Sequence, residues 1–185
     1  LWNIDLSNNI LGAVDIPNAA THKRLGLPAE INYFNSGVIM FNMPRWRESD
    51  CLNVLIDYIN QYKDILKNPD QDALNACFYK NRLTLNYTYN CITPFFKHKN
   101  SLGLSEGTLS SIQSNVVIVH FNGNARPWYF SCGHPYQKQY FNYLAQTPWR
   151  NFQPADKNLY TFFKKKLRKI IGLENFIQIK NTKGV

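Results

Sequence analysis

The chain has 185 residues, the length of one ordinary domain or of part of a larger one. With 44% apolar residues it can build a hydrophobic core, but no apolar run approaches the roughly 18 residues that a membrane-spanning helix needs. The net charge of +9 is uneven, because residues 157–185 carry eight Lys or Arg against one acid and the preceding 156 residues therefore carry only +2. This distribution excludes a globally basic nucleic-acid binder and indicates a near-neutral domain with a basic tail.

The first third of the chain predicts two strands and a helix. Residues 1–12 form a turn or a short helix that leads into a strand ending at residues 13–15. The run Val-Ile-Met-Phe at residues 38–41 indicates a buried strand that ends before Pro44. Apolar side chains then recur at helical spacing over residues 52–62, and Ser49 is the expected cap of that helix.

A second helix is predicted from the stretch that begins at Pro69. Its apolar residues again follow helical spacing, so Asp70 and Asp72 fall at its N-terminus. We expect Asp70 to cap this helix and Asp72 to interact with the positive end of the helix dipole. A short strand at residues 83–85 and a loop-rich stretch over residues 86–112 follow.

The last predicted strand covers residues 116–121, because residues 116–119 are apolar and mostly β-branched. Residues 136–144 predict a helix. The alternation of strands and helices indicates an α/β fold, and the long loops between them are typical of binding loops.

The segment directly after that strand concentrates ligand chemistry. The strand delivers His120 to its carboxyl end, where open α/β sheets bind their ligands, and imidazole suits divalent metals. Gly123 allows close approach of the backbone, and the Arg126 guanidinium matches phosphate oxygens. These residue types favour a metal–diphosphate site. The alternative is an ordinary hydrogen-bonded histidine with a packed Pro-Trp pair after it.

The basic tail predicts an amphipathic helix that begins near Asp156 and ends near Gly172. Apolar residues recur on one side of it, and Lys or Arg cluster beside them. Large aromatics opposite lysines are typical of a helix that lies on an anionic membrane surface. The alternative is a C-terminal helix packed on the core with a solvated lysine face.

Three segments in this order resemble glycosyltransferase family 8: Tyr33–Val38, Asp70–Asn75 and His120–Trp128. That family includes glycogenin and the bacterial galactosyl- and glucosyltransferases of lipopolysaccharide synthesis. The resemblance covers residues 1–130. It implies a GT-A fold, which is a Rossmann-like nucleotide-sugar transferase fold with a mixed sheet flanked by helices. Residues 1–150 would be the C-terminal part of this catalytic domain, and residues 151–185 would attach to a membrane.

The resemblance also implies a reaction, in which a hexose (galactose or glucose) passes from a UDP-sugar to a saccharide acceptor with retention of anomeric configuration. A divalent ion, Mn²⁺ or Mg²⁺, would assist. The acceptor would be a lipopolysaccharide or lipooligosaccharide, and the enzyme would be peripheral on the inner face of the cytoplasmic membrane, held there through residues 157–183. The family's Asp-x-Asp metal motif and its uridine-binding half do not occur in this sequence, so we expect them upstream of Leu1.

The resemblance assigns roles to residues at matching positions. His120 would be a metal ligand, and Gly123 and Arg126 would contact the diphosphate, with Arg126 standing where the family has lysine. Asn35, Asp70 and Gln71 would bind the donor sugar, and Asp70 and Gln71 would also line the reacting centre.

Two further acids complete the expected site. The neutral Gln71 amide is a poor nucleophile, which favours front-face substitution. If the reaction passes through a covalent intermediate instead, Asp72 is the carboxylate expected to form it. Asp15, at a strand end, would contact the acceptor, although an ordinary strand-ending aspartate accounts for it equally well. The competing hypothesis for the whole chain is a non-catalytic module that binds a glycan or a membrane. No specific nucleic-acid partner is expected.

Overall fold

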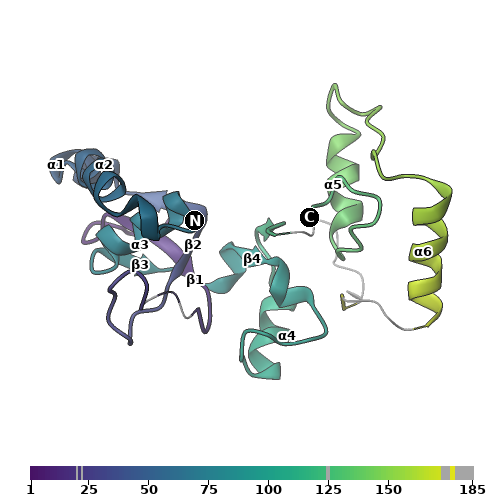
Figure 1. The fold of residues 1–185 in the computed structure, drawn as a ribbon, viewed down its shortest axis with the longest axis horizontal. Helices are drawn as coiled ribbons and strands as arrows, with labels where there is room; N and C mark the ends of the chain where they lie inside the picture. The colour runs from purple at the N-terminus through teal and green to yellow at the C-terminus, as the bar shows by residue number, and fades with distance from the viewer. Residues whose placement is uncertain (20, 22, 124–125, 172–175, 178–185) are drawn as a thin grey trace. The chain divides into compact units, whose positions relative to one another are not determined.

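The computed structural model describes residues 1–19, 21, 23–123, 126–171 and 176–177 (Figure 1). Gly172, the expected end of the C-terminal helix, lies outside the described residues. The chain divides into two compact units, Leu1–Asn90 and Cys91–Val185. This division falls within the 1–150 segment for which we expect one catalytic domain, so the expected boundary near residue 150 stays a prediction.

The first unit holds the mixed sheet. Its elements are β1 (Leu11–Asp15), β2 (Phe34–Phe41), α1 (Met43–Glu48), α2 (Cys51–Tyr62), the 3-10 turn Lys63–Ile65, α3 (Pro69–Phe78), β3 (Arg82–Thr84) and the 3-10 turn Tyr87–Tyr89. The sheet has the order β2-β1-β3, with β1 antiparallel to β2 and parallel to β3. The pairing of β1 with β2 shifts register between Ala13 and Val14, so Asp15 faces Phe34.

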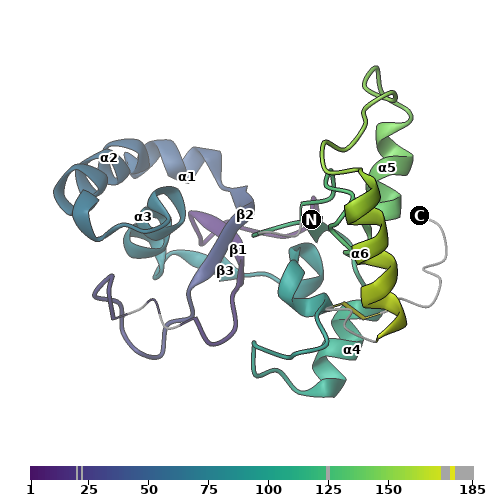
Figure 2. The same cartoon turned by 45° about the vertical axis from the view of Figure 1, so that its right-hand side comes forward.

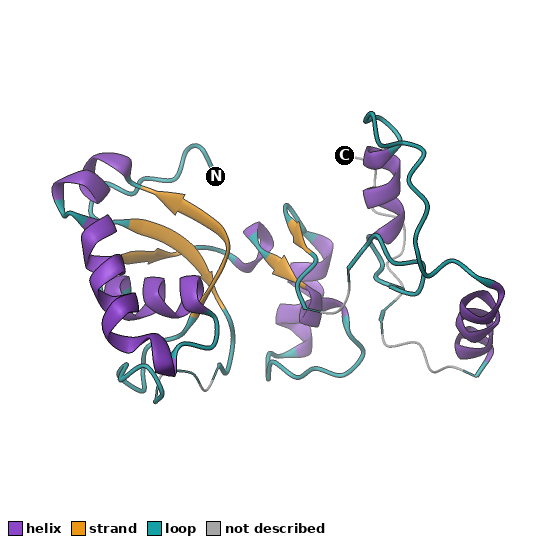
Figure 3. Cartoon of the chain, turned by 45° about the horizontal axis from the view of Figure 1, so that its top comes forward, coloured by secondary structure: helices purple, strands orange, loops and turns teal. Residues whose placement is uncertain are grey.

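Helices α1, α2 and α3 cover one face of this sheet, with α3 packed on β2 and α2 packed on α3 (Figure 3). The core between them contains Leu11, Ala13, Phe34, Cys51 and Phe78, all of them buried. The mixed sheet with flanking helices confirms the predicted α/β class. Both predicted helices of this unit are present, although α2 follows Asp50 and not the expected cap Ser49, which ends α1.

The second unit has less regular structure. Its elements are β4 (Cys91–Ile92), the 3-10 turn Thr93–Phe96, α4 (Glu106–Ser114), β5 (Val119–His120), α5 (Gln137–Leu144) and α6 (Leu159–Ile170) (Figure 2). The strands β4 and β5 pair in parallel, Cys91 with Val119 and Ile92 with His120. Predicting a buried strand over residues 116–121 was wrong in length and burial. The partner strand β4 is only two residues long, and Val117 is 62% exposed.

Helix α6 confirms the predicted C-terminal helix, but its cap differs from the expected one. Asn158 Oδ1 accepts a hydrogen bond from Thr161 N (2.9 Å) and so caps the helix in place of Asp156. The apolar residues Leu159, Phe163 and Ile170 are more than half exposed. This side of α6 is therefore exposed in the described part of the chain, and the membrane-surface helix and the core-packed helix both stay predictions. Among the described residues, no helix is long and apolar enough to cross a membrane.

Candidate functional site

The expected sugar-binding residues of the first unit meet where β2 begins and α3 begins. Asn35 and Ser36 lie on β2, and Asp70 and Gln71 lie in the first turn of α3. Ser36 Oγ donates to Asp70 Oδ2 (2.9 Å), and Gln71 Oε1 accepts from Ser36 N (2.9 Å) and from Asn35 Nδ2 (3.0 Å). Hydrogen bonds thus connect Asn35, Asp70 and Gln71 at one edge, where Ser36 binds both Asp70 and Gln71. All three belong to the motifs that carry the family resemblance.

Within this edge the acid and the amide face different partners. The Gln71 carbonyl oxygen is occupied by donors of β2, and Asn35 Oδ1 accepts from Asn90 Nδ2 (2.8 Å) and from Gly37 N (2.9 Å). Asn35 is buried, whereas Asp70 is exposed. The Asp70 carboxylate is therefore the exposed acceptor of this edge, and a carboxylate can accept charge-assisted hydrogen bonds.

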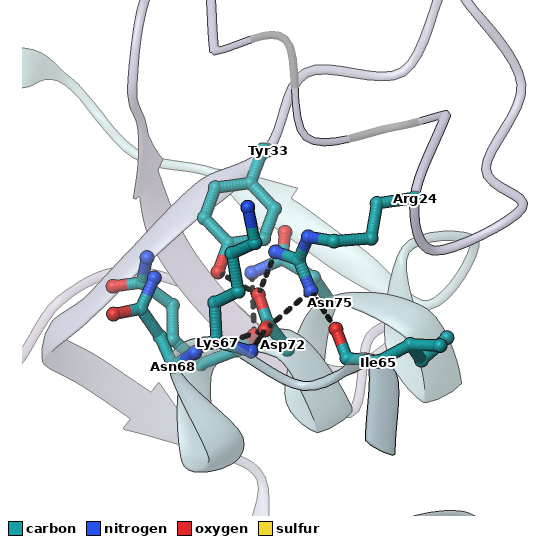
Figure 4. A network of polar contacts seen from close by, with 8 residues as sticks. Arg24, Tyr33, Ile65, Lys67, Asn68, Asp72 and Asn75 are labelled. Atoms are coloured by element: carbon teal, nitrogen blue, oxygen red, sulfur yellow. Dashed lines mark hydrogen bonds and ion pairs between the residues drawn. The ribbon is translucent and has the colours of Figure 1, made fainter. Parts of the chain in front are cut away.

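Asp72 stands in a different environment, because its side chain is fully buried. Figure 4 shows the polar contacts around its carboxylate. Arg24 binds it with two N–H groups (2.8 and 3.0 Å), and Tyr33 Oη donates to Oδ1 (2.6 Å). The backbone N–H groups of Lys67 (2.7 Å) and Asn68 (3.0 Å) donate to Oδ2. Asp72 thus binds two N–H groups that directly precede α3. The prediction that Asp70 caps α3 was wrong, because Asn68 takes the N-cap position.

The electrostatics follow from this network. Burial of Asp72 opposes its ionisation, but the hydrogen bonds from Arg24, Tyr33 and the two backbone amides outweigh burial and hold the pKa of Asp72 at about 2. Burial, together with the hydrogen bond to Asp72, raises the pKa of Tyr33. A carboxylate that is fully buried and so fully hydrogen-bonded is poorly suited to attack a sugar. The network indicates that Asp72 supports the start of α3 structurally.

Asn75 connects α3 to β2 through two hydrogen bonds. The sequence analysis did not identify this role. Its side-chain oxygen accepts from Phe34 N (2.8 Å), and its nitrogen donates to Phe34 O (2.9 Å), so a side chain takes the place of a neighbouring strand. It lies four residues after Gln71, one helical turn on, and that spacing is the signal that would have found it.

Asp15 is the expected acceptor contact, at the end of β1. Its carboxylate is paired with the Arg82 guanidinium, and both side chains are almost completely buried. Burial raises the pKa of Asp15 even though the Arg82 charge opposes that rise. In this structure Asp15 is thus an internal ion-pair partner, as an ordinary strand-ending aspartate would be.

The expected metal and diphosphate residues lie in the second unit. His120 ends β5 and is half-buried, and burial lowers its pKa, so its imidazole is neutral at neutral pH. A tight turn follows, in which Asn122 N donates to His120 O (2.9 Å). The Asn122 side chain accepts from Thr93 N (2.8 Å) and so fixes this turn to the segment after β4.

Gly123 and Arg126 continue from that turn. Gly123 is exposed and has a φ of +66°, which favours glycine over any other residue, and a Cβ there would meet no atom within 4 Å. Its bare backbone therefore faces open space. Arg126 is exposed, with its guanidinium 5.7 Å from the centre of the Trp128 ring. Residues 124 and 125 lie outside the described residues.

The chemistry of His120 fits a metal ligand, because a neutral imidazole nitrogen is the form that coordinates divalent ions. One imidazole does not make a centre. Within the described part of the chain, no three His, Cys, Asp or Glu side chains come together as a metal site would require. The described residues therefore offer His120 as a single candidate ligand.

His134 is a buried histidine of the second unit. It is 2% exposed, and its ring contacts Phe96, Phe121 and Phe176. Its Nδ1 accepts from Tyr136 N (3.2 Å), and burial lowers its pKa to about 4, so it is a neutral core residue.

Solved structures of glycosyltransferases share the fold of this chain. The chain is similar to the galactosyltransferase LgtC, solved in complex with donor and acceptor sugar analogues, with a TM-score of 0.66 and 25% identity over 80% of this chain and 55% of that one. The glycosyltransferase GlyE of Streptococcus pneumoniae TIGR4 has a TM-score of 0.58 at 16% identity over 97% of this chain and 40% of its own, a likeness of fold alone. The predicted GT-A type of fold is confirmed.

Sequence comparison gives the family. The profile of glycosyl transferase family 8 matches residues 1–132, and the chain belongs to this family. It is 33% identical to general stress protein A of Bacillus subtilis (strain 168) over 80% of this chain and 54% of that protein. It is 25% identical to a lipopolysaccharide 1,2-glucosyltransferase of Escherichia coli (strain K12) over 78% of this chain and 43% of that enzyme. The chain spans about half the length of the curated relatives it matches.

Proposed function

We propose that the full-length protein is a retaining, metal-dependent glycosyltransferase that moves a hexose, galactose or glucose, from a UDP-sugar to a saccharide acceptor of the lipopolysaccharide or lipooligosaccharide type. Family membership supports sugar transfer. The observation that carries the proposal within this chain is the hydrogen-bonded edge of Asn35, Ser36, Asp70 and Gln71, where the exposed Asp70 carboxylate offers acceptors for sugar hydroxyls.

The proposed chemistry breaks the bond between the anomeric carbon and the diphosphate oxygen. The acceptor hydroxyl oxygen forms the new bond to that carbon from the same face, and its proton passes to the departing diphosphate oxygen. A bound Mn²⁺ or Mg²⁺ would offset negative charge on the diphosphate. His120 would supply one metal ligand, and Arg126 would bind phosphate oxygens through two N–H groups. The buried environment of Asp72 favours this front-face route over a covalent intermediate on that residue.

The Asp70→Asn variant tests the sugar-binding edge. The substitution keeps the shape of the side chain but removes its charge, and the lost charge-assisted hydrogen bonds should lower kcat/KM for the UDP-hexose about 10- to 100-fold. A panel of UDP-sugars with Mn²⁺ and with EDTA identifies the donor by UDP release, and the variant is then measured with that donor.

The matched control is Asp64→Asn, an exposed acid in the 3-10 turn before α3. This variant should keep the wild-type kcat/KM. Equal kcat/KM for Asp70→Asn and the wild type would remove Asp70 from the donor site. A complete panel without UDP release would contradict the proposed function as a whole.

We also propose that residues 157–183 attach the protein to the anionic inner face of the cytoplasmic membrane. Helix α6 lies within this segment. Phe163 and Leu167 are 62% and 56% exposed, and Lys165 between them lies about 160° around the helix from each. Lys165 Nζ is bound to Phe130 O (2.8 Å). One residue of the polar side of α6 thus binds the rest of the second unit, which supports an apolar side that faces a lipid surface.

The double variant Phe163→Ala/Leu167→Ala tests this attachment. Its affinity for vesicles that contain phosphatidylglycerol should fall at least about tenfold in a cosedimentation assay, because two large apolar side chains no longer enter the lipid. Leu52→Ala, which truncates an exposed leucine on α2, is the control and should leave vesicle binding unchanged. Unchanged sedimentation of the double variant would rule out attachment through this face.

A further inference from the structure

Residues 126–132 form a loop that follows the turn at residues 120–123. We refer to it as the Arg126 loop. It consists of tight turns, in which Tyr129 N donates to Arg126 O (3.2 Å) and Cys132 N donates to Tyr129 O (3.1 Å). Side chains from three later parts of the chain bind its backbone.

Asp156, in the linker before α6, binds two successive N–H groups of this loop. Its Oδ1 accepts from Phe130 N (2.7 Å) and its Oδ2 accepts from Ser131 N (3.0 Å). Burial opposes ionisation of this carboxyl, but the hydrogen bonds from Ser131 and Phe130 outweigh it and lower the pKa of Asp156. A carboxylate that spans two adjacent amides fixes the orientation of the peptide between them.

Lys165 and Gln137 bind the carbonyl groups of the same loop. Lys165, on the polar side of α6, donates from Nζ to Phe130 O (2.8 Å), and the same ammonium lies 4.8 Å from the centre of the Phe130 ring. Gln137, at the start of α5, donates from Nε2 to Pro127 O (3.0 Å) and to Tyr129 O. Lys165 Nζ is also 3.5 Å from Gln137 Oε1, so the two side chains support each other.

We propose that Asp156, Gln137 and Lys165 are positioning residues that hold the Arg126 guanidinium where the donor diphosphate binds. This inference rests on the proposed function, in which Arg126 contacts the diphosphate. Arg126 is exposed and begins the loop, so its direction depends on the backbone that these three side chains hold. An exposed loop without such partners samples many conformations, and fixing it in advance removes an entropic cost of ligand binding.

The first test measures UDP binding by the full-length protein in solution with Mn²⁺ and without membranes. Lys165→Met keeps an unbranched side chain of similar length but removes the ammonium, and its Kd for UDP should rise about tenfold. Lys166→Met, with the same loss of charge at an exposed neighbour on α6, should bind UDP as the wild type does. Lys165→Arg retains a donor and should restore most of the affinity.

The second test follows amide hydrogen exchange at Phe130 and Ser131, which does not depend on activity. Asp156→Ala should speed exchange at these two amides at least about tenfold and weaken UDP binding, while Lys166→Met changes neither. Should the wild type bind UDP and Lys165→Met or Asp156→Ala bind it equally well, the positioning role is refuted and the proposed function stands. Should the wild-type protein bind no UDP at all, both are refuted.

Discussion

Replacing Asp72 by alanine is expected to lower the free energy of unfolding by about 3–5 kcal/mol, the usual cost of removing one partner from a buried ion pair. The substitution leaves the Arg24 guanidinium, whose side chain is 20% exposed, without its carboxylate. It also removes the acceptor of Tyr33 Oη and of the Lys67 and Asn68 amides. Chemical denaturation of the full-length protein, followed by the fluorescence of Trp46 in the adjacent core, measures the change.

The control for this prediction is Asp70→Ala, two residues earlier on the same helix. Asp70 is exposed, and its carboxylate accepts a hydrogen bond from Ser36 Oγ, so its removal should change the free energy of unfolding by no more than about 0.5 kcal/mol. Equal destabilisation by the two substitutions would contradict the assignment of Asp72 as the structural acid and Asp70 as the functional one.

Acid gives a second check on Asp72. Its folded-state pKa of about 2 lies below the ordinary value of 3.8, so the ionised carboxylate stabilises the fold above about pH 4. That stabilisation, about 2 kcal/mol, is lost as the pH falls through the folded-state pKa. The difference in stability between the wild type and Asp72→Ala should therefore narrow between pH 4 and pH 2. A difference that stays constant across this range would show that Asp72 is not held ionised by its partners.

His120→Ala is expected to abolish turnover of the UDP-hexose and to weaken Mn²⁺ binding together. The Mn²⁺ affinity should fall at least about tenfold, because removal of a residue that only supports a metal ligand already weakens metal binding by about that factor. Mn²⁺ titration followed by electron paramagnetic resonance reads metal binding without relying on turnover. Activity and Mn²⁺ affinity are measured on the same preparation of full-length protein.

The matched control for His120 is His98→Ala, which removes an exposed histidine from the same unit. It should leave both Mn²⁺ affinity and turnover unchanged. Full activity of His120→Ala in the presence of EDTA would exclude the proposed metal role. A loss of turnover with unchanged Mn²⁺ affinity would move His120 from metal ligand to another part of the site.

The elements with strong local patterns were predictable from the sequence. The apolar spacing after Pro69 predicted α3, and the Val-Ile-Met-Phe run predicted the end of β2. The family motifs assign Asn35, Asp70 and Gln71 to one site, and in the structure all three lie on one hydrogen-bonded edge. These features depend on residues close in sequence or on a motif that the family shares.

Other features depend on partners distant in sequence. The different environments of Asp70 and Asp72 follow from Arg24, which binds Asp72 from 48 residues earlier in the chain. No local sequence pattern indicates the pairing of Arg24 with Asp72. The short β5 follows from the length of its partner β4, which a run of β-branched residues does not reveal. Helix α4 was missed because it has few apolar residues, although Ser105 followed by Glu106 is a helix-start signal.

Asp70 is proposed to bind the hexose of the donor and not its nucleotide. Calorimetric titration of the full-length wild type and of Asp70→Asn, with UDP-hexose and separately with UDP in the presence of Mn²⁺, tests it most directly. We predict that the substitution weakens binding of the UDP-hexose at least about tenfold and leaves binding of UDP unchanged. Equal affinity of the two proteins for UDP-hexose, or an equal loss for both ligands, would contradict the claim.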